Sequence, residues 1–413
     1  MGHATEVINR QPRRLKIRRR PPRLQIDVPL VLIITTLVTL GLLMMYSASW
    51  DASLTVTKGE SSTYLFFRQL KWVGLGTVGL VVMLLIDYHN WKRFSVPAMG
   101  LTLLALVAVL IYGETFGNTN RSFYNGSYQP SEVAKIVVVI YLAVWLYAKR
   151  DQLEDIYFGL IPLGAIIGLT SGLILIQPDL SASAVVLLMG GFMFFLAGSA
   201  PFQTGILLSL ATGIGYLFLR FNPTDNSRIS DFMIGWESIA DSNWHVQKAL
   251  IAFSRGEWFG VGIGRSITKF TTLPFPHTDS VFAVIAEEVG VFGASLVVLL
   301  FALLLWRGLV IAKNAPDGLG SLLAAGLTLW IVLEAFMNMA SLMGLMPFAG
   351  NTLPFFSLGG SNLVMTLAAV GIVLNVSRLS EKQQEEENRR AFGAIVDLRR
   401  RNRRRSIPRG RRS

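Results

Sequence analysis

The chain has 413 residues, of which 52% are hydrophobic and 15% charged, and this composition excludes an ordinary soluble globular protein. The formal charge of +12 comes from the two tails: residues 1–24 carry eight Lys and Arg against one acid, and residues 378–413 carry thirteen against five. We interpret the tails as topology signals attracted to anionic lipid, so no nucleic-acid partner is expected. The absence of cysteine excludes disulfides, Cys-based metal sites and thiol catalysis.

Apolar runs close to the length that crosses a bilayer as a helix recur along the chain. Lipid offers the backbone no hydrogen bonds, so such runs form helices and not open strands. The fold class is therefore expected to be an all-α membrane protein of about ten transmembrane helices. The expected spans are Val28–Ser47, Phe66–Asp87, Phe94–Tyr112, Lys135–Tyr147 with its flanks, Ile156–Ile176, Leu180–Gly198, Gln203–Arg220, Val281–Trp306, Gly318–Met343 and Ser357–Val376.

The basic tails and short basic loops set the expected orientation. The positive-inside rule places both tails in the cytoplasm, which agrees with an even number of spans. The first apolar run is a full span without a clear cleavage pattern, so we expect no cleavable signal. The expected organisation is a basic N-terminal arm (1–27), a ten-helix membrane domain (28–377) and a basic C-terminal tail (378–413).

The longest connection, 221–280, joins the seventh and eighth expected spans and is predicted to be a large extracytoplasmic loop. Long structured loops in compact folds tend to be functional. Trp236, Trp244 and Trp258 fit aromatic residues at headgroup level. The segment Asp241–Ser254 is predicted to form an amphipathic helix, with Trp244, Ala249, Ile251 and Phe253 toward the membrane.

Two features of this loop suit an anion. Gly260–Ser266 has a glycine at every second position to Gly264, and a turn whose amides meet an anion is one interpretation. It neither follows a clear strand nor opens a Rossmann helix, so a dinucleotide site is not expected. The loop's basic residues either meet an anionic group, such as a lipid pyrophosphate, or pair with the loop's own acids. They are Arg228, Lys248, Arg255, Arg265 and Lys269.

Ionisable residues at expected helix ends are the candidate site, because charge is costly in lipid. Glu132 and Lys135 share one helix face, either as a local ion pair or as site residues. Asp179 is either a helix N-cap or a catalytic acid. Asp279 could cap a helix too, but a carboxylate beside His277 at the membrane edge suits deprotonation of a sugar hydroxyl, and we favour that interpretation.

Two further segments are expected near the same outer helix ends as these acids. Glu287 and Glu288 are adjacent in the eighth span and cannot face the same way, so at least one is expected to point into the bundle. Pro347–Ser361 is punctuated by proline and glycine. Irregular backbone at membrane depth is tolerated where protein or a wet cavity surrounds it, so this segment is expected to form a cavity wall.

Four of these motifs occur together in an order that resembles the SEDS family, the family of FtsW, RodA and SpoVE. They are Gln129–Lys135, Gln177–Leu180, Leu273–Asp279 followed by Phe282–Gly290, and Leu353–Phe355 with Ser357 and Gly359–Ser361. The resemblance covers about residues 28–377 and leaves the two tails uncovered. Met45–Ser49 occurs in several branches of the family, and we lean slightly toward the FtsW branch.

The resemblance implies a peptidoglycan glycosyltransferase that polymerises lipid II at the outer face of the inner membrane. It implies that Asp279 is the catalytic base. Glu132, Lys135, Asp179 and Arg121 match further family positions, and by charge we assign Lys135 and Arg121 to the pyrophosphate. Lys269, His277 and Ser361 are also expected to bind substrate. A divalent cation (Mg or Mn) that assists the leaving group is expected, with ligands that the sequence does not identify.

The resemblance also implies partners: a class B penicillin-binding protein as transpeptidase, and other divisome or elongasome proteins. Two alternatives stay open. A lipid II flippase would need polar groups that continue to the inner leaflet, whereas the candidate residues cluster at outer helix ends, which favours an enzyme. A non-catalytic divisome scaffold would not need Asp279.

Overall fold

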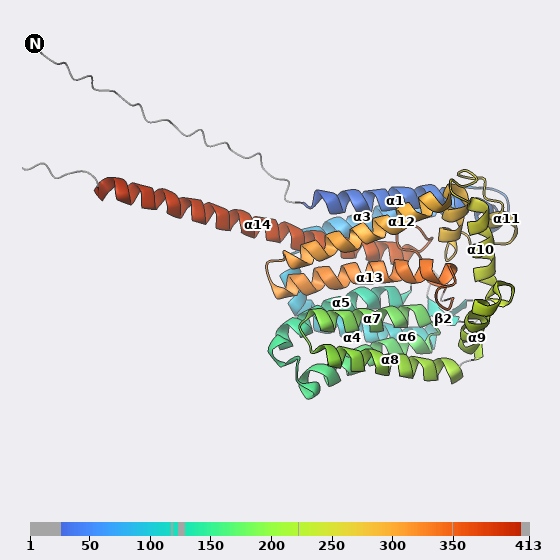
Figure 1. Cartoon of the computed structure of the whole chain (residues 1–413), viewed down its shortest axis with the longest axis horizontal. Coiled ribbons are helices and arrows are strands. Elements are labelled where there is room, and N and C mark those ends of the chain that lie inside the picture. Colours follow the sequence, from blue (N-terminus) through green and yellow to red (C-terminus); the bar gives the residue numbers. More distant parts are fainter. Residues whose placement is uncertain (1–25, 117–118, 123–128, 222, 349, 406–413) are drawn as a thin grey trace, which may run out of the picture.

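The computed structural model describes residues 26–116, 119–122, 129–221, 223–348 and 350–405. Most of them form long helices that run side by side along one direction (Figure 1). These helices are α1 (Val28–Ala48), α3 (Tyr64–Leu85), α4 (Trp91–Tyr112), α5 (Pro130–Lys149), α6 (Ile161–Ile176), α7 (Leu180–Leu196), α8 (Pro201–Phe221), α12 (Val281–Lys313), α13 (Gly318–Leu342) and α14 (Gly360–Arg405).

Eight of the helices in the described part of the chain are long and apolar enough to cross a membrane, and α7 is a shorter apolar helix of 17 residues. Together with α8 they occupy the positions of the predicted spans. The predicted all-α membrane fold is therefore confirmed. The count of ten stays a prediction, because neither α7 nor α8 belongs to the group of eight.

Shorter elements connect the bundle helices. Two of them, β1 and β2, pair as antiparallel strands, a small exception to the all-α prediction. The short elements are α2 (Trp50–Val56), η1 (Tyr88–Asn90), β1 (Glu114–Phe116), β2 (Thr119–Ser122), η2 (Arg150–Gln152), η3 (Ile156–Leu160), α9 (Pro223–Glu237), η4 (Ile239–Asp241), α10 (Trp244–Gly256) and α11 (Thr268–Thr271).

The two ends of the bundle differ. At one end α1 begins and α14 extends beyond the other helices, whereas α9, α10 and α11 lie across the opposite end, which we call the loop end (Figure 1). The predicted amphipathic helix in the 221–280 connection is present as α10. Its predicted membrane face is partly wrong: Trp244 and Ile251 are exposed, but Ala249 is buried with Val246, because this side of α10 packs on α12.

The predicted span from Val281 is interrupted, because α12 is broken at Gly290, where φ is 72°. A backbone loop lies against this break: Val261 N and Gly262 N donate to the carbonyls of Glu287 and Glu288, both over 3.0 Å. A Cβ at Gly290 would lie 2.4 Å from Gly260 N. Gly260 and Gly290 thus allow close backbone packing, and the anion-cradle interpretation is wrong for the amides of Val261 and Gly262.

The centre of the bundle is formed by α5, α13 and α14, which bury the largest shares of their apolar stretches. Proline at the first position of α5 suits a helix start, since its missing N–H would have no helical partner there. This start lies at the loop end, as do the starts of α7 and α12 and the end of α13 (Figure 1). The central helices therefore bring their terminal residues together at that end.

Candidate functional site

A buried ionic network joins α5 to α13. Glu132 and Lys135 lie one turn apart on α5, and Lys135 Nζ is 2.8 Å from Glu132 Oε2. The same ammonium is 2.8 Å from Glu334 Oε1 of α13. The side chains of Lys135 and Glu334 are only 2% and 3% exposed. The local ion pair predicted from sequence is confirmed, but it belongs to a network in which two carboxylates share one ammonium.

Glu334 is a site residue that the sequence analysis missed. The signal for it was a single acid within an apolar span, where an ionisable residue is a functional candidate by default. Trp330 Nε1 donates to Glu334 Oε2 over 3.0 Å. Asn362 Nδ2 of α14 donates to Glu132 Oε2 and to Glu334 Oε1, each over 2.8 Å. Both oxygens of Glu334 are therefore hydrogen-bonded, which offsets the cost of a buried charge.

Asp179 connects α7 to the start of α5. Its Oδ1 accepts a hydrogen bond from Ala182 N over 3.1 Å, which is the N-cap interaction predicted for it. Its Oδ2 accepts hydrogen bonds from Gln129 Nε2 over 2.8 Å and from Ser131 Oγ over 3.2 Å. The capping role is confirmed, and the second oxygen fixes this carboxylate beside Glu132.

Asp279 lies on a turn directly before α12 and is not its cap. The N-cap of α12 is Ser280, whose side chain makes no capping hydrogen bond. Ser280 N donates to the carbonyl of Phe275, which closes the turn, and Asn338 Nδ2 of α13 donates to the carbonyl of Asp279 over 2.9 Å. The Asp279 side chain is only partly buried. The backbone of Asp279 is therefore held in place at the end of α13, and the residue is partly exposed.

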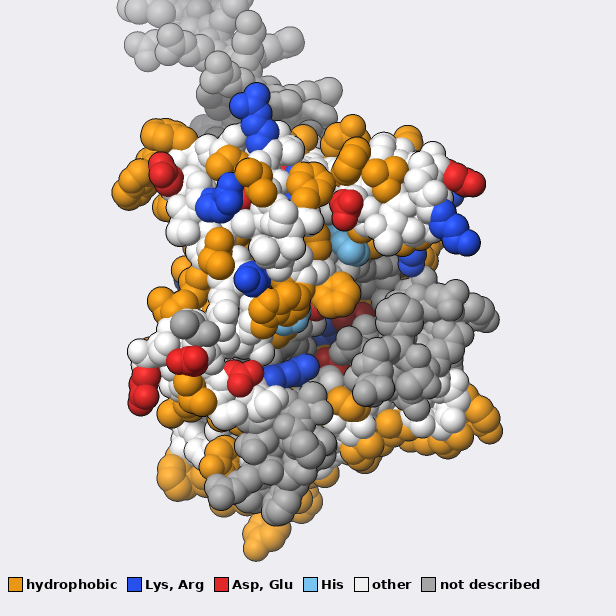
Figure 2. Space-filling view, turned by 90° about the vertical axis from the view of Figure 1, so that its right-hand side faces the viewer, with side chains coloured by type: hydrophobic (Ala, Val, Ile, Leu, Met, Phe, Trp, Pro, Cys, Tyr) orange, Lys and Arg blue, Asp and Glu red, His pale blue; other side chains and the backbone are white. Residues whose placement is uncertain are grey.

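One cavity at the loop end is lined by four residues that the sequence predicted: Glu132, Lys135, Asp179 and Asp279. Its volume is about 100 Å³, room for several waters or a small polar group, whereas typical ligand pockets begin at about 300 Å³. Figure 2 looks onto the loop end and shows acidic and basic side chains at the bottom of a hollow. The lining residues are Gln129, Glu132, Lys135, Asp179, Ser181, Ala182, Val185, Asp279, Glu334, Gly350, Asn351 and Thr352.

The lining has two consequences. Residues 350–352 belong to the segment predicted as a cavity wall, so that prediction is confirmed for them. Four carboxylates face one ammonium, which is already shared by Glu132 and Glu334. The cavity is therefore acidic, and Lys135 fits a residue that holds the acids in position better than a ligand for pyrophosphate.

Three other predicted site residues are not among the described residues that line this cavity: Lys269, His277 and Ser361. The backbone of Arg121 lies on β2, and its side chain is outside the described part of the structure. Lys269 is buried with Nζ 2.6 Å from Glu288 Oε1. His277 lies on the Asp279 turn, and burial lowers the pKa of its imidazole to about 4. Ser361 lies in the first turn of α14. Their roles in substrate binding stay predictions.

Glu287 and Glu288 point to different sides of α12 and are both buried. Glu287 Oε1 is 3.3 Å from Arg255 Nε, and Glu288 Oε2 accepts a hydrogen bond from Ser47 Oγ over 2.8 Å. Lys269 Nζ also donates to Ser47 Oγ. Arg255 and Lys269 thus pair with acids, as one interpretation of the basic loop predicted, but the acids belong to α12. This pairing ties the 255–269 segment to α12 and α1.

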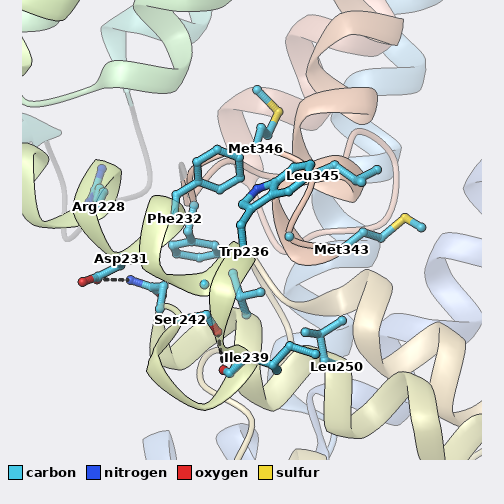
Figure 3. Close-up of a pocket in the computed structure, with 15 residues that line it drawn as sticks. Arg228, Asp231, Phe232, Trp236, Ile239, Ser242, Leu250, Met343, Leu345 and Met346 are labelled. Carbon is cyan, nitrogen blue, oxygen red and sulfur yellow. Dashed lines mark hydrogen bonds between the residues drawn. The ribbon is translucent and has the colours of Figure 1, made fainter.

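An apolar pocket of about 280 Å³ lies between α9, α10 and the segment that follows α13. Figure 3 shows Phe232 and Trp236 of α9 lying toward Leu345 and Met346. The charged side chains in its wall are Arg228 and Asp231, and Asn243 Nδ2 donates to Asp231 Oδ2 over 3.3 Å. The chemistry of the wall suits a hydrocarbon chain.

The described side chains do not form a ligand set for a metal. They include no group of three or more His, Asp or Glu arranged around one ion. In the acidic cavity, Glu132 Oε2 and both oxygens of Asp179 and Glu334 already accept hydrogen bonds from neighbouring groups. The expected divalent cation stays a prediction.

The fold and the cavity define a class: a multi-pass membrane protein that holds a cluster of carboxylates where its central helices end at the loop end. Residues 28–382 match the family model of the FtsW, RodA and SpoVE cell cycle proteins. The chain therefore belongs to this family, as its motifs predicted.

Individual relatives agree with this assignment. The chain is 37% identical over 360 residues to stage V sporulation protein E of Bacillus subtilis (strain 168), covering 86% of this chain and 97% of that protein. It is 36% identical over 381 residues to the probable peptidoglycan glycosyltransferase FtsW of Marinobacter nauticus, covering 89% and 95%.

Solved structures agree as well. A chain from a structural study of polymerization and crosslinking by a peptidoglycan synthase complex superposes with a TM-score of 0.68 at 27% identity, covering 86% of this chain and 99% of that chain. The crystal structure of the rod shape determining protein RodA of Thermus thermophilus gives a TM-score of 0.63 at 26% identity, covering 87% and 98%. The fold is therefore that of the family.

Proposed function

We propose that this protein is a peptidoglycan glycosyltransferase that polymerises lipid II into glycan strands for division or elongation. Relatives named probable peptidoglycan glycosyltransferase FtsW match it over most of their length. The observation that carries the proposal is the position of Asp279, a partly exposed residue that lines an acidic cavity together with Glu132, Asp179 and Glu334. A carboxylate so placed can accept a proton from a bound hydroxyl.

In the proposed reaction, Asp279 accepts the proton of the 4-hydroxyl of the acceptor N-acetylglucosamine. That oxygen forms a bond to the anomeric carbon of the donor sugar, while the bond from this carbon to the pyrophosphate breaks. The bonding electrons leave with undecaprenyl pyrophosphate, and the glycan grows by one disaccharide. Asn338 positions the base through its hydrogen bond to the carbonyl of Asp279. Such positioning lowers the entropic cost of bringing the reacting groups together.

The lipid part of this substrate suits the second pocket. Lipid II carries a long apolar chain, and the apolar pocket between α9 and α10 lies at the same end of the molecule as the acidic cavity. The pyrophosphate needs positive charge nearby. Lys135 is shared by two acids, so Arg121 and a divalent cation are the remaining proposals for this role.

The proposed setting is the bacterial inner membrane, with the loop end outside and both tails in the cytoplasm. The basic residues of the tails support this orientation under the positive-inside rule. A class B penicillin-binding protein is the proposed partner, since a structural relative comes from a study of a peptidoglycan synthase complex. Such a partner would crosslink the strands made at the loop end.

The test is glycan polymerisation from purified lipid II by the full chain in detergent with its cognate class B penicillin-binding protein. Gel separation of the products is expected to show a ladder of glycan strands. The same protein is then placed in vesicles that contain lipid II. Translocation of lipid II without polymerisation would contradict the proposal in favour of a flippase, and the absence of both activities would favour a scaffold.

A further inference from the structure

Three aromatic rings form a stack that leads from the interior of the loop end to its surface. His245 of α10 is the middle ring: its centroid is 4.3 Å from that of Phe348 with planes 16° apart, and 6.5 Å from that of Phe275 with planes 10° apart. Phe348 is 8% exposed, whereas Phe275 is 61% exposed. The outermost ring therefore presents a large part of its surface outside the fold.

The inner end of the stack lies beside the proposed base. A Cβ at Gly350 would be 3.8 Å from Phe348 Cε1 and 3.5 Å from Asp279 Oδ2, so the ring and the carboxylate flank the same glycine. Phe275, at the outer end of the stack, lies four residues before Asp279 in the sequence. Ser280 N donates to the carbonyl of Phe275 over 3.3 Å and closes the turn between them. Phe275 and Asp279 are thus fixed on one closed turn.

Folding alone does not explain Phe275. Its φ of 46° is in the left-handed region, which costs a residue with a side chain on the order of 1–3 kcal/mol. A phenylalanine with 61% of its surface exposed recovers little of this cost through burial. Strained residues of this kind cluster at ligand-binding and active sites.

We propose that Phe275, on the same turn as Asp279, is a platform on which a pyranose ring of the substrate stacks. The inference rests on the proposed function and identifies a residue that selects the sugar part of the substrate. One face of a pyranose is formed by C–H groups, which pack on the electron-rich face of an aromatic ring. The stack stays uncharged at neutral pH, because burial and the nearby charge of Arg228 lower the pKa of His245 to about 4.

The experiment measures equilibrium binding of fluorescently labelled lipid II to the full chain, so it does not depend on turnover. Phe275→Gly removes the ring at a backbone conformation that glycine adopts without strain, and Phe275→Leu keeps an apolar side chain without a flat face. Both variants are expected to raise the Kd about two- to tenfold. Phe275→Trp is expected to keep the Kd of the wild type.

Two controls test whether the sugar is the part of lipid II that Phe275 contacts. Phe259→Ala removes an exposed ring of the same loop that contacts Phe292, and it is expected to leave the Kd unchanged. Undecaprenyl pyrophosphate without its disaccharide is expected to bind the wild type and Phe275→Gly equally. The proposal is overturned if Phe275→Leu binds lipid II as the wild type does, or if the Phe275→Gly loss persists for undecaprenyl pyrophosphate. Glycan polymerisation by the wild type separately decides the proposed function.

Discussion

Replacing Lys135 with methionine removes the ammonium that lies 2.8 Å from both Glu132 and Glu334. An exposed ion pair would contribute at most about 1 kcal/mol. This one is different, because the side chains of Lys135 and Glu334 are 2% and 3% exposed. Loss of one partner of a buried pair costs about 3–5 kcal/mol, since it leaves uncompensated buried charge. We expect Lys135→Met to reduce the free energy of unfolding by about this amount.

The matched variant is Lys135→Met combined with Glu334→Gln. The glutamine is neutral and keeps the shape of the side chain, so one buried carboxylate remains in place of two. We expect it to recover about half of the stability lost in Lys135→Met. Unfolding in detergent, followed by tryptophan fluorescence, measures both variants. The reasoning is refuted if the single variant costs less than about 1 kcal/mol or if the double variant is no more stable than the single one.

The same pair of variants tests whether Lys135 binds phosphate. If the Lys135 ammonium pairs only with Glu132 and Glu334, it does not bind phosphate. The folded double variant is then expected to bind undecaprenyl pyrophosphate with a Kd within about twofold of the wild type. A direct hydrogen bond from an ammonium to a phosphate contributes about 1.5–3 kcal/mol. A loss of affinity of about tenfold or more in the double variant would therefore restore Lys135 as a pyrophosphate ligand.

Two further predictions concern the loop end. Gly290→Ala is expected to lower the free energy of unfolding by about 1–3 kcal/mol from backbone strain alone, because φ is 72°. The new Cβ would also lie 2.4 Å from Gly260 N, which adds to the loss. Gly100→Ala on α4, with nothing within 4 Å, is its control, and equal stabilities of the two variants would contradict the reasoning. The free energy of unfolding is also expected to decrease as the pH is lowered from 6.5 to 4. Burial lowers the pKa of His245 and His277 from 6.5 to about 4, so the unfolded chain binds more protons than the folded chain between these values. The loss from pH 6.5 to 4 is at most about 3 kcal/mol per histidine, and an equally steep loss in His245→Phe would exclude His245 as a source.

Much of the fold was predictable, because apolar runs near 20 residues have one stable form in lipid. The break in α12 was not, since Gly290 interrupts an apolar run without changing its composition. What decides the break is the backbone of 257–262, which lies more than 20 residues away in sequence and donates hydrogen bonds to the carbonyls of Glu287 and Glu288. Tertiary contacts of this kind are absent from local hydropathy.

The candidate site was predictable in part. Acids at the expected starts of helices stand out against apolar neighbours, which is why Glu132, Asp179 and Asp279 were identified. Glu334 was missed, because its role depends on the meeting of α13 with α5. Lys269 was predicted to bind substrate from its charge, but its buried partner Glu288 becomes visible only when the loop is folded onto α12.

The most direct test of the central claim compares Asp279→Asn with the wild type in glycan polymerisation from purified lipid II. Asp51→Asn, at an exposed acid of α2, is the matched control. Loss of a general base is expected to lower kcat by about 10²–10⁴ while the Kd for lipid II stays within about twofold. Polymer formation by well-folded Asp279→Asn at the rate of the wild type and of Asp51→Asn would contradict the assignment of Asp279 as the base.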